Sequence, residues 1–178
     1  MRMFARLALV SLGLLAFSAQ AEVQCANQND SLAPTTPVSE FTLHEDGTVN
    51  HVTTGLTWMR CSLGQDWDGT TCNGTASTHT WQEALQAVEA LNSGGGFAGH
   101  NDWRLPNKNE LNSIVERKCY EPAINGAIFP ATPADWYWSS SPYADDKTGA
   151  WNVSFNGGCV LASPKTELDR VRLVREGR

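Results

Sequence analysis

The feature that most constrains the fold is an aromatic segment at residues 136–143, which reads Trp-Tyr-Trp-Ser-Ser-Ser-Pro-Tyr. It holds four of the ten Trp and Tyr residues of the chain. Because side chains alternate along a strand, Trp136 and Trp138 share one face and Tyr137 points to the other. Each indole supplies roughly 150–250 Å² of area, so we expect both to be anchored in a core. The serines and Pro142 then turn the chain outward into a polar loop.

The first 21 residues have the pattern of an export signal. Arg2 and Arg6 precede an apolar run at 7–17, and a small-x-small cleavage site ends at Ala21. The apolar run is too short to span a membrane, and no second run follows, so we expect no membrane span. The sequence therefore predicts cleavage after Ala21 and a periplasmic or secreted protein.

The remaining length and charge suggest one acidic domain. Without Arg2 and Arg6, 11 basic side chains face 19 acidic ones, a formal charge of −8. That balance argues against a nucleic-acid partner. Residues 22–39 carry prolines among polar residues and are interpreted as an extended leader, and residues 40–178 as a single domain with a core of its own.

All five cysteines follow the predicted cleavage site, and an exported protein meets an oxidising compartment. Cys61 and Cys72 bracket a loop rich in Gly, Asp and Thr, so a disulfide between them is the first prediction; it would contribute about 2–3 kcal/mol. Cys25 is paired with Cys119, which ties down the leader. Cys159 is left as a buried free thiol or an intermolecular disulfide. Metal binding by these cysteines is not expected, because no C-x-x-C pair exists.

Two helices are predicted from capping boxes. Thr80 and Glu83 begin the first, whose apolar positions recur at helical spacing until Asn92. Asn107 and Glu110 begin the second, which we expect to run to Cys119.

Strands are predicted on both sides of these helices. A hairpin at 41–43 and 49–52 precedes a third strand at 56–59, and four strands are expected at 136–139, 150–155, 159–162 and 171–174. Residues 156–158, Asn-Gly-Gly, predict a tight hairpin between two of them. Together the elements predict an α+β domain with two helices packed on small antiparallel sheets.

Four blocks carry a family resemblance: Thr-Gly-Leu-Thr-Trp-Met-Arg-Cys at 54–61, Asn-Asp-Trp-Arg-Leu-Pro-Asn at 101–107, the aromatic segment, and Val-Arg-Leu-Val-Arg at 171–175. Their order and spacing resemble the bacterial family named for the C-terminal domain of the Legionella collagen-like adhesin. The resemblance implies a C-type-lectin-like fold, shared with formylglycine-generating sulfatase-modifying enzymes, whose late loops form a ligand surface. In the adhesin, this domain is associated with sulfated glycosaminoglycans.

This chain departs from that adhesin. It has no collagen-like Gly-X-Y region, so the trimerising stalk is missing. Residues 144–170 hold four acidic side chains against three basic ones, a poor environment for sulfate. The resemblance therefore implies a glycan or protein ligand at the cell surface without naming it.

The candidate binding surface lies in the loops between residues 142 and 170. We expect Trp151, Val153 and Phe155 to share a buried face, and their alternating neighbours to point outward. An ordinary solvated strand fits the same pattern equally well. The candidate ligand-binding residues are Tyr143, Asp145, Asp146, Lys147, Asn152, Ser154 and Asn156.

Three other features have a structural and a functional interpretation. Arg104 could clamp an anionic ligand, but pairing with Asp102 or Glu110 is favoured. Arg172 and Arg175 are likewise expected to pair with acids at the edge of the core. Asp-Trp-Asp-Gly at 66–69 resembles the start of a calcium loop but lacks its distal Glu, so a disulfide-closed loop is favoured.

No catalytic constellation can be assembled. The four histidines are scattered without metal-ligand spacing, and no G-x-S-x-G surrounds the serines at 139–141. We therefore predict a non-enzymatic recognition or adhesion module with no cofactor and no metal. The alternatives are an accessory subunit of a surface assembly and, less favoured, an enzyme related to the sulfatase-modifying factors.

Overall fold

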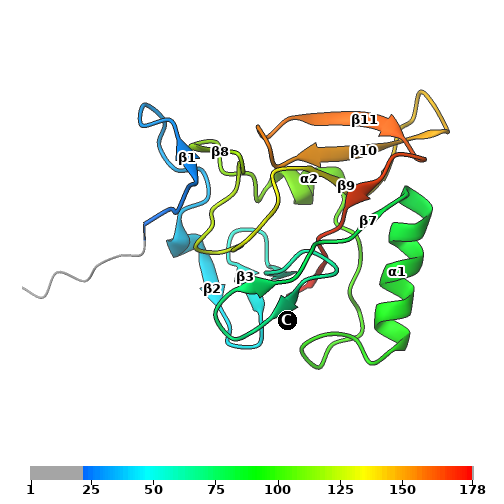
Figure 1. Ribbon diagram of the computed structural model, residues 1–178, viewed down its shortest axis with the longest axis horizontal. Coiled ribbons are helices and arrows are strands. Elements are labelled where there is room, and N and C mark those ends of the chain that lie inside the picture. Colours follow the sequence, from blue (N-terminus) through cyan, green and yellow to red (C-terminus); the bar gives the residue numbers. More distant parts are fainter. Residues whose placement is uncertain (1–21, 178) are drawn as a thin grey trace, which may run out of the picture.

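The computed structural model describes residues 22–177, so the predicted export signal at 1–21 lies outside the described residues. The two largest sheets are mostly antiparallel, and two helices lie beside them (Figure 1). This is the predicted α+β class. The larger sheet has five strands in the order β11 (Val160–Pro164), β10 (Gly149–Ser154), β9 (Trp136–Pro142), β12 (Asp169–Arg170) and β7 (Thr78–His79). Its one parallel pair joins β12 to β9.

The second sheet has four strands in the order β13 (Val174–Glu176), β4 (Leu56–Met59), β3 (Thr48–His51) and β2 (Phe41–Leu43). The predicted hairpin and the third strand after it are confirmed. The turn of the hairpin contains Gly47 with φ +84°, a left-handed conformation that favours glycine. A short 3₁₀ turn, η1 (Val38–Glu40), leads into this sheet.

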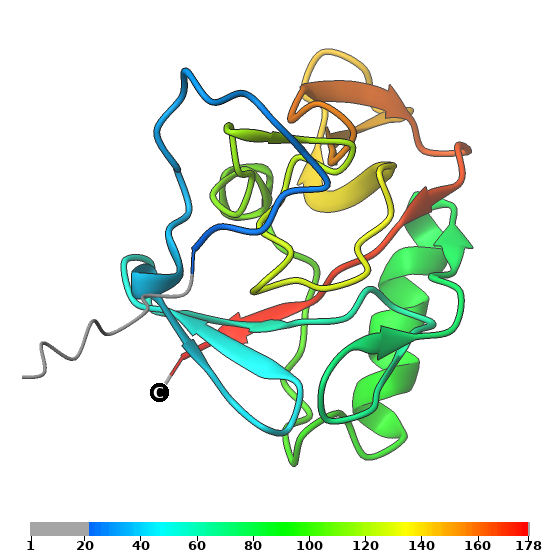
Figure 2. The ribbon, with the colours of Figure 1, turned by 60° about the vertical axis from the view of Figure 1, so that its left-hand side comes forward.

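The predicted strand at 171–174 is only partly a strand. Residues 171–173 connect β12 in one sheet to β13 in the other, as the red segment of Figure 2 shows. The carbonyls of Val171 and Leu173 accept hydrogen bonds from the backbone N–H groups of Leu63 (2.9 Å) and Met59 (3.0 Å). The segment is buried because it passes between the two sheets, so its apolar residues resembled a regular strand.

Both predicted helix starts are confirmed. Helix α1 (Trp81–Ser93) has a complete capping box of Thr80 and Glu83, and α2 (Lys108–Asn112) has one of Asn107 and Glu110. The second helix is shorter than predicted. After Asn112 the chain continues in tight turns with i to i+3 hydrogen bonds, and Cys119 lies in the short strand β8 (Cys119–Tyr120).

The apolar residues form two clusters, one including Trp58, Tyr137 and Phe155, the other including Trp103 and Trp138. Tyr137 and Trp138 are both 0% exposed, so β9 is covered on both faces. Trp136 is only half-buried. The expectation that both tryptophans anchor a core is therefore correct for Trp138 alone, because a central strand between two clusters does not separate a buried face from an exposed one.

Both predicted disulfides are present. Cys61–Cys72 closes the hairpin of β5 (Asp66–Trp67) and β6 (Cys72–Asn73), and Cys25–Cys119 holds the leader. Cys159 is free, but it is exposed, so the prediction of a buried thiol is wrong. It stands at the end of a hairpin turn, where no element covers it. Two disulfides indicate an oxidising, extracytoplasmic location.

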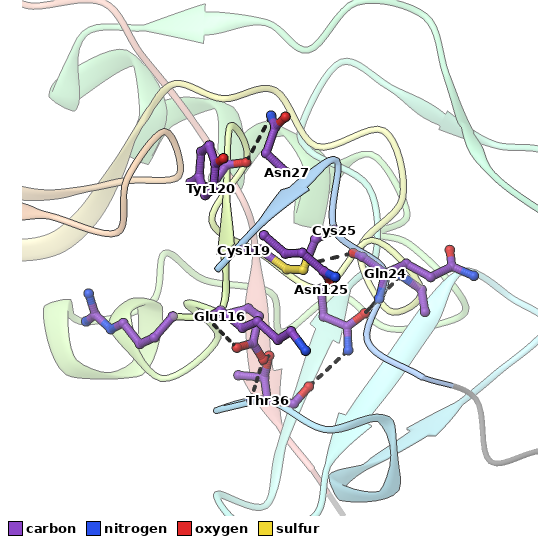
Figure 3. The surroundings of a disulfide bond; sticks show 12 residues. Gln24, Cys25, Asn27, Thr36, Glu116, Cys119, Tyr120 and Asn125 are labelled. Atoms are coloured by element: carbon purple, nitrogen blue, oxygen red, sulfur yellow. Dashed lines mark hydrogen bonds between the residues drawn. A yellow bond between two sulfur atoms is a disulfide. The ribbon is translucent and has the colours of Figure 1, made fainter. Parts of the chain in front are cut away.

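The leader is bound closely to the rest of the fold (Figure 3). Strand β1 (Asn27–Gln28) pairs with β8. The carboxylate of Glu116 accepts hydrogen bonds from the backbone N–H groups of Thr35 (2.9 Å) and Thr36 (2.7 Å), and Asn125 donates to the Thr36 carbonyl (3.0 Å). One disulfide and several buried polar contacts therefore anchor a segment that has few apolar residues.

Candidate ligand-binding surface

The structure separates the predicted site residues into three groups. Asn152 and Ser154 are buried, with exposures of 1% and 4%. Asn156 is exposed but lies in the turn between β10 and β11. The remaining four residues lie at or beside the turn between β9 and β10, at the opposite end of β10. The predicted set therefore does not form one surface.

The prediction that Asn152 and Ser154 point outward is wrong. Asn152 Nδ2 donates to Asp169 Oδ2 (2.7 Å) and to Ser163 Oγ (2.9 Å). Burial raises the pKa of the Asp169 carboxyl, although the bond from Asn152 opposes that shift. Strand β10 lies between β9 and β11 with side chains covering both faces, so alternation could not tell an inner face from an outer one.

The turn between β9 and β10 is exposed and stabilised by its own polar groups. Asp146 Oδ1 accepts from Thr148 Oγ1 (2.7 Å) and from the Thr148 N–H (2.8 Å), which lowers the pKa of the Asp146 carboxyl. Lys165 Nζ donates to the carbonyl of Lys147 (2.8 Å). The hydrogen bond to Asp145 and its charge raise the pKa of the Tyr143 phenol, which keeps its proton. The turn therefore has a defined conformation on the surface.

An aromatic pair with a lysine lies on one side of this turn. Trp151 is half-buried, not part of the core as predicted. Its ring meets the Tyr143 ring edge-on, with centroids 5.2 Å apart and an interplanar angle of 88°. The ammonium of Lys108, from α2, lies 4.1 Å from the Trp151 ring centroid. This is a cation–π arrangement on an accessible indole.

A second tryptophan–lysine pair lies at the start of α1. Lys165 Nζ is 4.5 Å from the centroid of the half-buried Trp81 ring. The Trp81 indole is fixed because its Nε1–H donates to the Ser139 carbonyl (2.9 Å). The backbone N–H of Trp81 donates to the Lys165 carbonyl (3.0 Å). The two residues border an open depression of about 430 Å³, lined by Thr80, Trp81, Gln82, Lys165 and Thr166.

Ser139 of β9 links the two pairs. Its carbonyl accepts from Trp81, and its hydroxyl donates to the Trp151 carbonyl (2.6 Å). We call the residues Tyr143, Trp151, Lys108, Trp81 and Lys165 the turn surface. Sequence reasoning found only Tyr143: it placed Trp151 in the core, and it did not consider Lys108, Trp81 or Lys165 as ligand contacts. Lys108 lies in α2, Trp81 in α1 and Lys165 directly after β11, and only tertiary folding brings these segments together.

Two of the three arginines have the expected partners. Arg104 forms a double hydrogen bond with Glu110 (2.8 and 2.9 Å) and also reaches Glu176 (2.6 Å). Arg175 binds Asp102 at 2.7 Å. Both guanidinium groups are occupied by acids of the chain itself, so they are structural.

Arg172 contradicts the expectation of an acidic partner. It is 0% exposed and donates to the Met59 carbonyl (3.0 Å), the Arg60 carbonyl, Thr132 Oγ1 (2.7 Å) and Ser62 Oγ (3.3 Å). Its guanidinium also lies 4.8 Å from the Phe129 ring centroid. Burial lowers the pKa of Arg172 to about 10. The residue joins the segment between the sheets to neighbouring loops.

The Asp-Trp-Asp-Gly loop is a disulfide-closed hairpin. Asp68 accepts from the N–H groups of Thr71 and Thr70 (2.8 Å each) and from Asn73 Nδ2 (2.6 Å), and these bonds lower the pKa of the Asp68 carboxyl. The carboxylate oxygens of Asp68 therefore stabilise the turn by these hydrogen bonds. Among residues 22–177, no group of three His, Cys, Asp or Glu side chains is placed to hold a metal ion.

Taken together, these features define a class: a small disulfide-bonded α+β domain with an exposed surface of aromatic rings and lysines. Within the part of the chain that the structure describes, no helix is long and apolar enough to cross a membrane. The model of the Lcl C-terminal domain family matches residues 47–175, and the chain belongs to that family. No curated protein matches the chain. The match begins at the β2–β3 turn, so the anchored leader lies outside it.

Proposed function

We propose that this protein is an exported, non-enzymatic recognition module of the adhesin type, with a C-type-lectin-like fold. It binds a glycan or a surface protein through the turn surface. The observation that carries the proposal is the pair of half-buried tryptophans, Trp81 and Trp151, each with a lysine ammonium over its ring. Membership of the Lcl C-terminal domain family supports the adhesin-type assignment.

The chemistry of this surface suits a ligand with apolar faces and many hydroxyl groups. Flat aromatic rings offer area to the C–H face of a sugar or to aliphatic side chains, and they do so with little loss of conformational freedom. The lysines and the hydroxyls of Thr80 and Thr166 add hydrogen bonds around the Trp81 depression. The fixed turn and the anchored Trp81 provide a preorganised site, which reduces the entropic cost of binding.

Export is part of the proposal. The predicted signal at 1–21 would direct the chain to the periplasm or beyond, where the two disulfides form. The acidic net charge keeps nucleic acid out of the proposed ligand classes. The proposal gives no catalytic role to the one serine–histidine contact among the described residues: Ser77 Oγ lies 2.8 Å from His79 Nε2, but the same hydroxyl also donates to the Leu63 carbonyl (3.0 Å).

The test is a binding screen of the disulfide-bonded protein on a glycan array and on extracted surface proteins. The Tyr143→Ser and Lys165→Gln variants should each weaken binding roughly tenfold, the scale of a contact residue. Tyr120→Ser, at the distant strand β8, is the matched control, since Tyr120 is 46% exposed. If both variants bind as the wild type does, the turn surface is not the binding site.

A second candidate function is that of an accessory subunit in a surface assembly. The exposed, unpaired Cys159 favours it, because such a thiol can form a disulfide with another chain in an oxidising compartment. Stable incorporation into a larger complex, lost on Cys159→Ser and accompanied by no ligand binding, would favour this function.

A further inference from the structure

Strand β11 lies at an open edge of the five-stranded sheet. It pairs with β10 on one side, and no element lies beyond it on the other (Figure 1). At the two ends of this ladder, the Ser154 N–H donates to the Cys159 carbonyl and the Lys165 N–H donates to the Thr148 carbonyl, both at 2.8 Å. Along an antiparallel strand, the backbone N–H and carbonyl groups of successive residues point alternately to one neighbouring strand and to the other side. In β11, the backbone groups of the odd-numbered residues therefore point toward β10.

The even-numbered residues therefore present their backbone to solvent. Val160 and Ala162 each have an N–H and a carbonyl on the outer edge, and no partner within residues 22–177 bonds to them. Pro164 contributes no N–H and ends the open stretch. The free edge thus consists of two donors and two acceptors.

Apart from Pro164 at its end, this edge has no protecting residue. Exposed edge strands commonly carry charges, above all lysine, that prevent pairing with another chain. Strand β11 has no charged residue, and Leu161 at its centre is 52% exposed. An uncharged edge with an exposed leucine is a suitable template for strand addition.

We propose that β11 pairs antiparallel with β11 of a second copy of this chain, about a twofold axis that places Leu161 opposite its own counterpart. In this register Val160 lies opposite Ala162 of the second copy. The N–H of each donates to the carbonyl of the other, and the twofold axis repeats the pair. All four open backbone groups are satisfied, and two exposed leucines cover each other.

The strand fits its own copy better than it fits a foreign strand. Twofold pairs are the commonest oligomers because a single self-complementary patch suffices. Pro164 closes the open stretch in both copies, so a longer foreign strand would gain no further bond on that side. Beyond the strand, Lys165 would face Gly157 of the second copy, so the register brings no like charges together.

The pairing does not use the free thiol. Cys159 would lie opposite Ser163 of the second copy, offset from its own counterpart by four residues, or roughly 13 Å along the strand. Disulfides require Cα atoms closer than about 7 Å. The dimer is therefore non-covalent and is independent of the proposed function, because its formation needs no ligand.

Site-directed cross-linking tests the register. In a Cys159→Ser background, Leu161→Cys places one thiol directly opposite itself in a non-hydrogen-bonded pair, where Cα atoms are about 4.5 Å apart. Glutathione disulfide serves as the oxidant: two protein thiols lose two protons and two electrons to form the intermolecular bond, and one oxidant molecule becomes two glutathione thiols. The matched control is Leu168→Cys in the same background, at a residue that is 60% exposed.

We expect the Leu161→Cys protein to form covalent dimers at least roughly tenfold faster than the Leu168→Cys protein, because pairing raises the local thiol concentration. Sedimentation of the wild-type chain should show a concentration-dependent dimer. The Leu161→Lys substitution should abolish this dimer, because it places two ammonium groups opposite each other, where they repel. Equal cross-linking rates, or a wild-type chain that sediments as a monomer at every concentration, would overturn the proposal. So would a Leu161→Lys protein that still dimerises. Thermal unfolding of each variant confirms that it is folded.

Discussion

The contact that anchors the leader can be tested through one buried carboxylate. Glu116 is 0% exposed and accepts from the backbone N–H groups of Thr35 (2.9 Å), Thr36 (2.7 Å) and Lys118 (2.8 Å), and from Thr36 Oγ1 (2.8 Å). All of these groups are donors. The Glu116→Gln variant keeps the size of the side chain, removes its charge and turns one acceptor oxygen into a donor. An amide NH₂ then faces backbone N–H groups, which cannot accept a hydrogen bond from it, and the Thr36 hydroxyl is the only one of these partners that can.

The stability lost in Glu116→Gln follows from the number and kind of these hydrogen bonds. A hydrogen bond to a charged group contributes about 1.5–3 kcal/mol, and a buried donor without a partner costs a further 1–3 kcal/mol. Contributions within one network are not additive, so we expect Glu116→Gln to lower the free energy of unfolding by about 3–5 kcal/mol. That is a large part of the 5–15 kcal/mol that stabilises an ordinary domain.

The pH dependence supplies a second measure of the same contact. Burial alone would raise the pKa of Glu116, but the donors of Thr35, Lys118 and Thr36 outweigh it and the pKa is lowered. The unfolded carboxyl titrates near pH 4.3. The stabilisation is therefore fully present above about pH 4.3 and is lost as the pH falls from there toward the pKa of the folded state. Wild type and Glu116→Gln should converge in stability at acid pH.

Urea denaturation of the disulfide-bonded protein at pH 7 and at pH 3 measures both quantities. Glu89→Gln, at an exposed position of α1, is the matched control and should stay within about 0.5 kcal/mol of the wild type. If the free energy of unfolding of Glu116→Gln at pH 7 falls by no more than that of this control, the carboxylate does not anchor the leader. A difference that persists unchanged at pH 3 would refute the electrostatic part of the reasoning.

Three further predictions concern other buried or reactive groups. Arg172→Met should lower the free energy of unfolding, measured by urea denaturation, by about 3 kcal/mol or more. The reason is that several buried acceptors, among them the Met59 and Arg60 carbonyls, lose their donor. An unchanged denaturation midpoint would show that the guanidinium is dispensable for stability. Burial lowers the pKa of the His51 imidazole. The wild type should therefore lose stability as the pH falls below about 6.5, the pKa of histidine in the unfolded chain. Unfolding midpoints measured from pH 7.5 to 5 should show this loss in the wild type and not in His51→Gln. Cys159 should react with a thiol reagent at one equivalent per native chain, and Cys159→Ser should give none, whereas reaction only after denaturation would contradict its exposure.

Much of the secondary structure could be predicted because it depends on neighbours in the sequence. Capping boxes at Thr80 and Asn107 place the helix starts within one turn, and a glycine-bearing turn defines the hairpin after Phe41. The pairing of Cys61 with Cys72 follows from a short polar loop between two nearby cysteines, which has too few apolar residues to order itself by burial. Local rules failed where a segment ended for a tertiary reason, as at Asn112, where tight turns replace the helix.

The candidate site shows the limit of periodicity. Alternation along β10 correctly placed Val153 and Phe155 inside, but it placed Asn152 and Ser154 outside, and both are buried. A strand that is covered on both faces can hold polar side chains in its interior, provided that they find partners such as Asp169. Alternation in the sequence does not reveal whether the second face is covered.

The sequence by itself therefore determined the class, the family, the helix starts and the Cys61–Cys72 disulfide, because each depends on short-range patterns or on a characteristic order of blocks. Only the tertiary structure decided which residues form the surface. Trp81 comes from α1, Lys108 from α2 and Lys165 from the residues after β11. They lie near the β9–β10 turn because β9 lies next to α1, α2 and β10, and because Lys165 reaches the Lys147 carbonyl in that turn. Exposure and proximity belong to the packed chain, and no local pattern of residues encodes them.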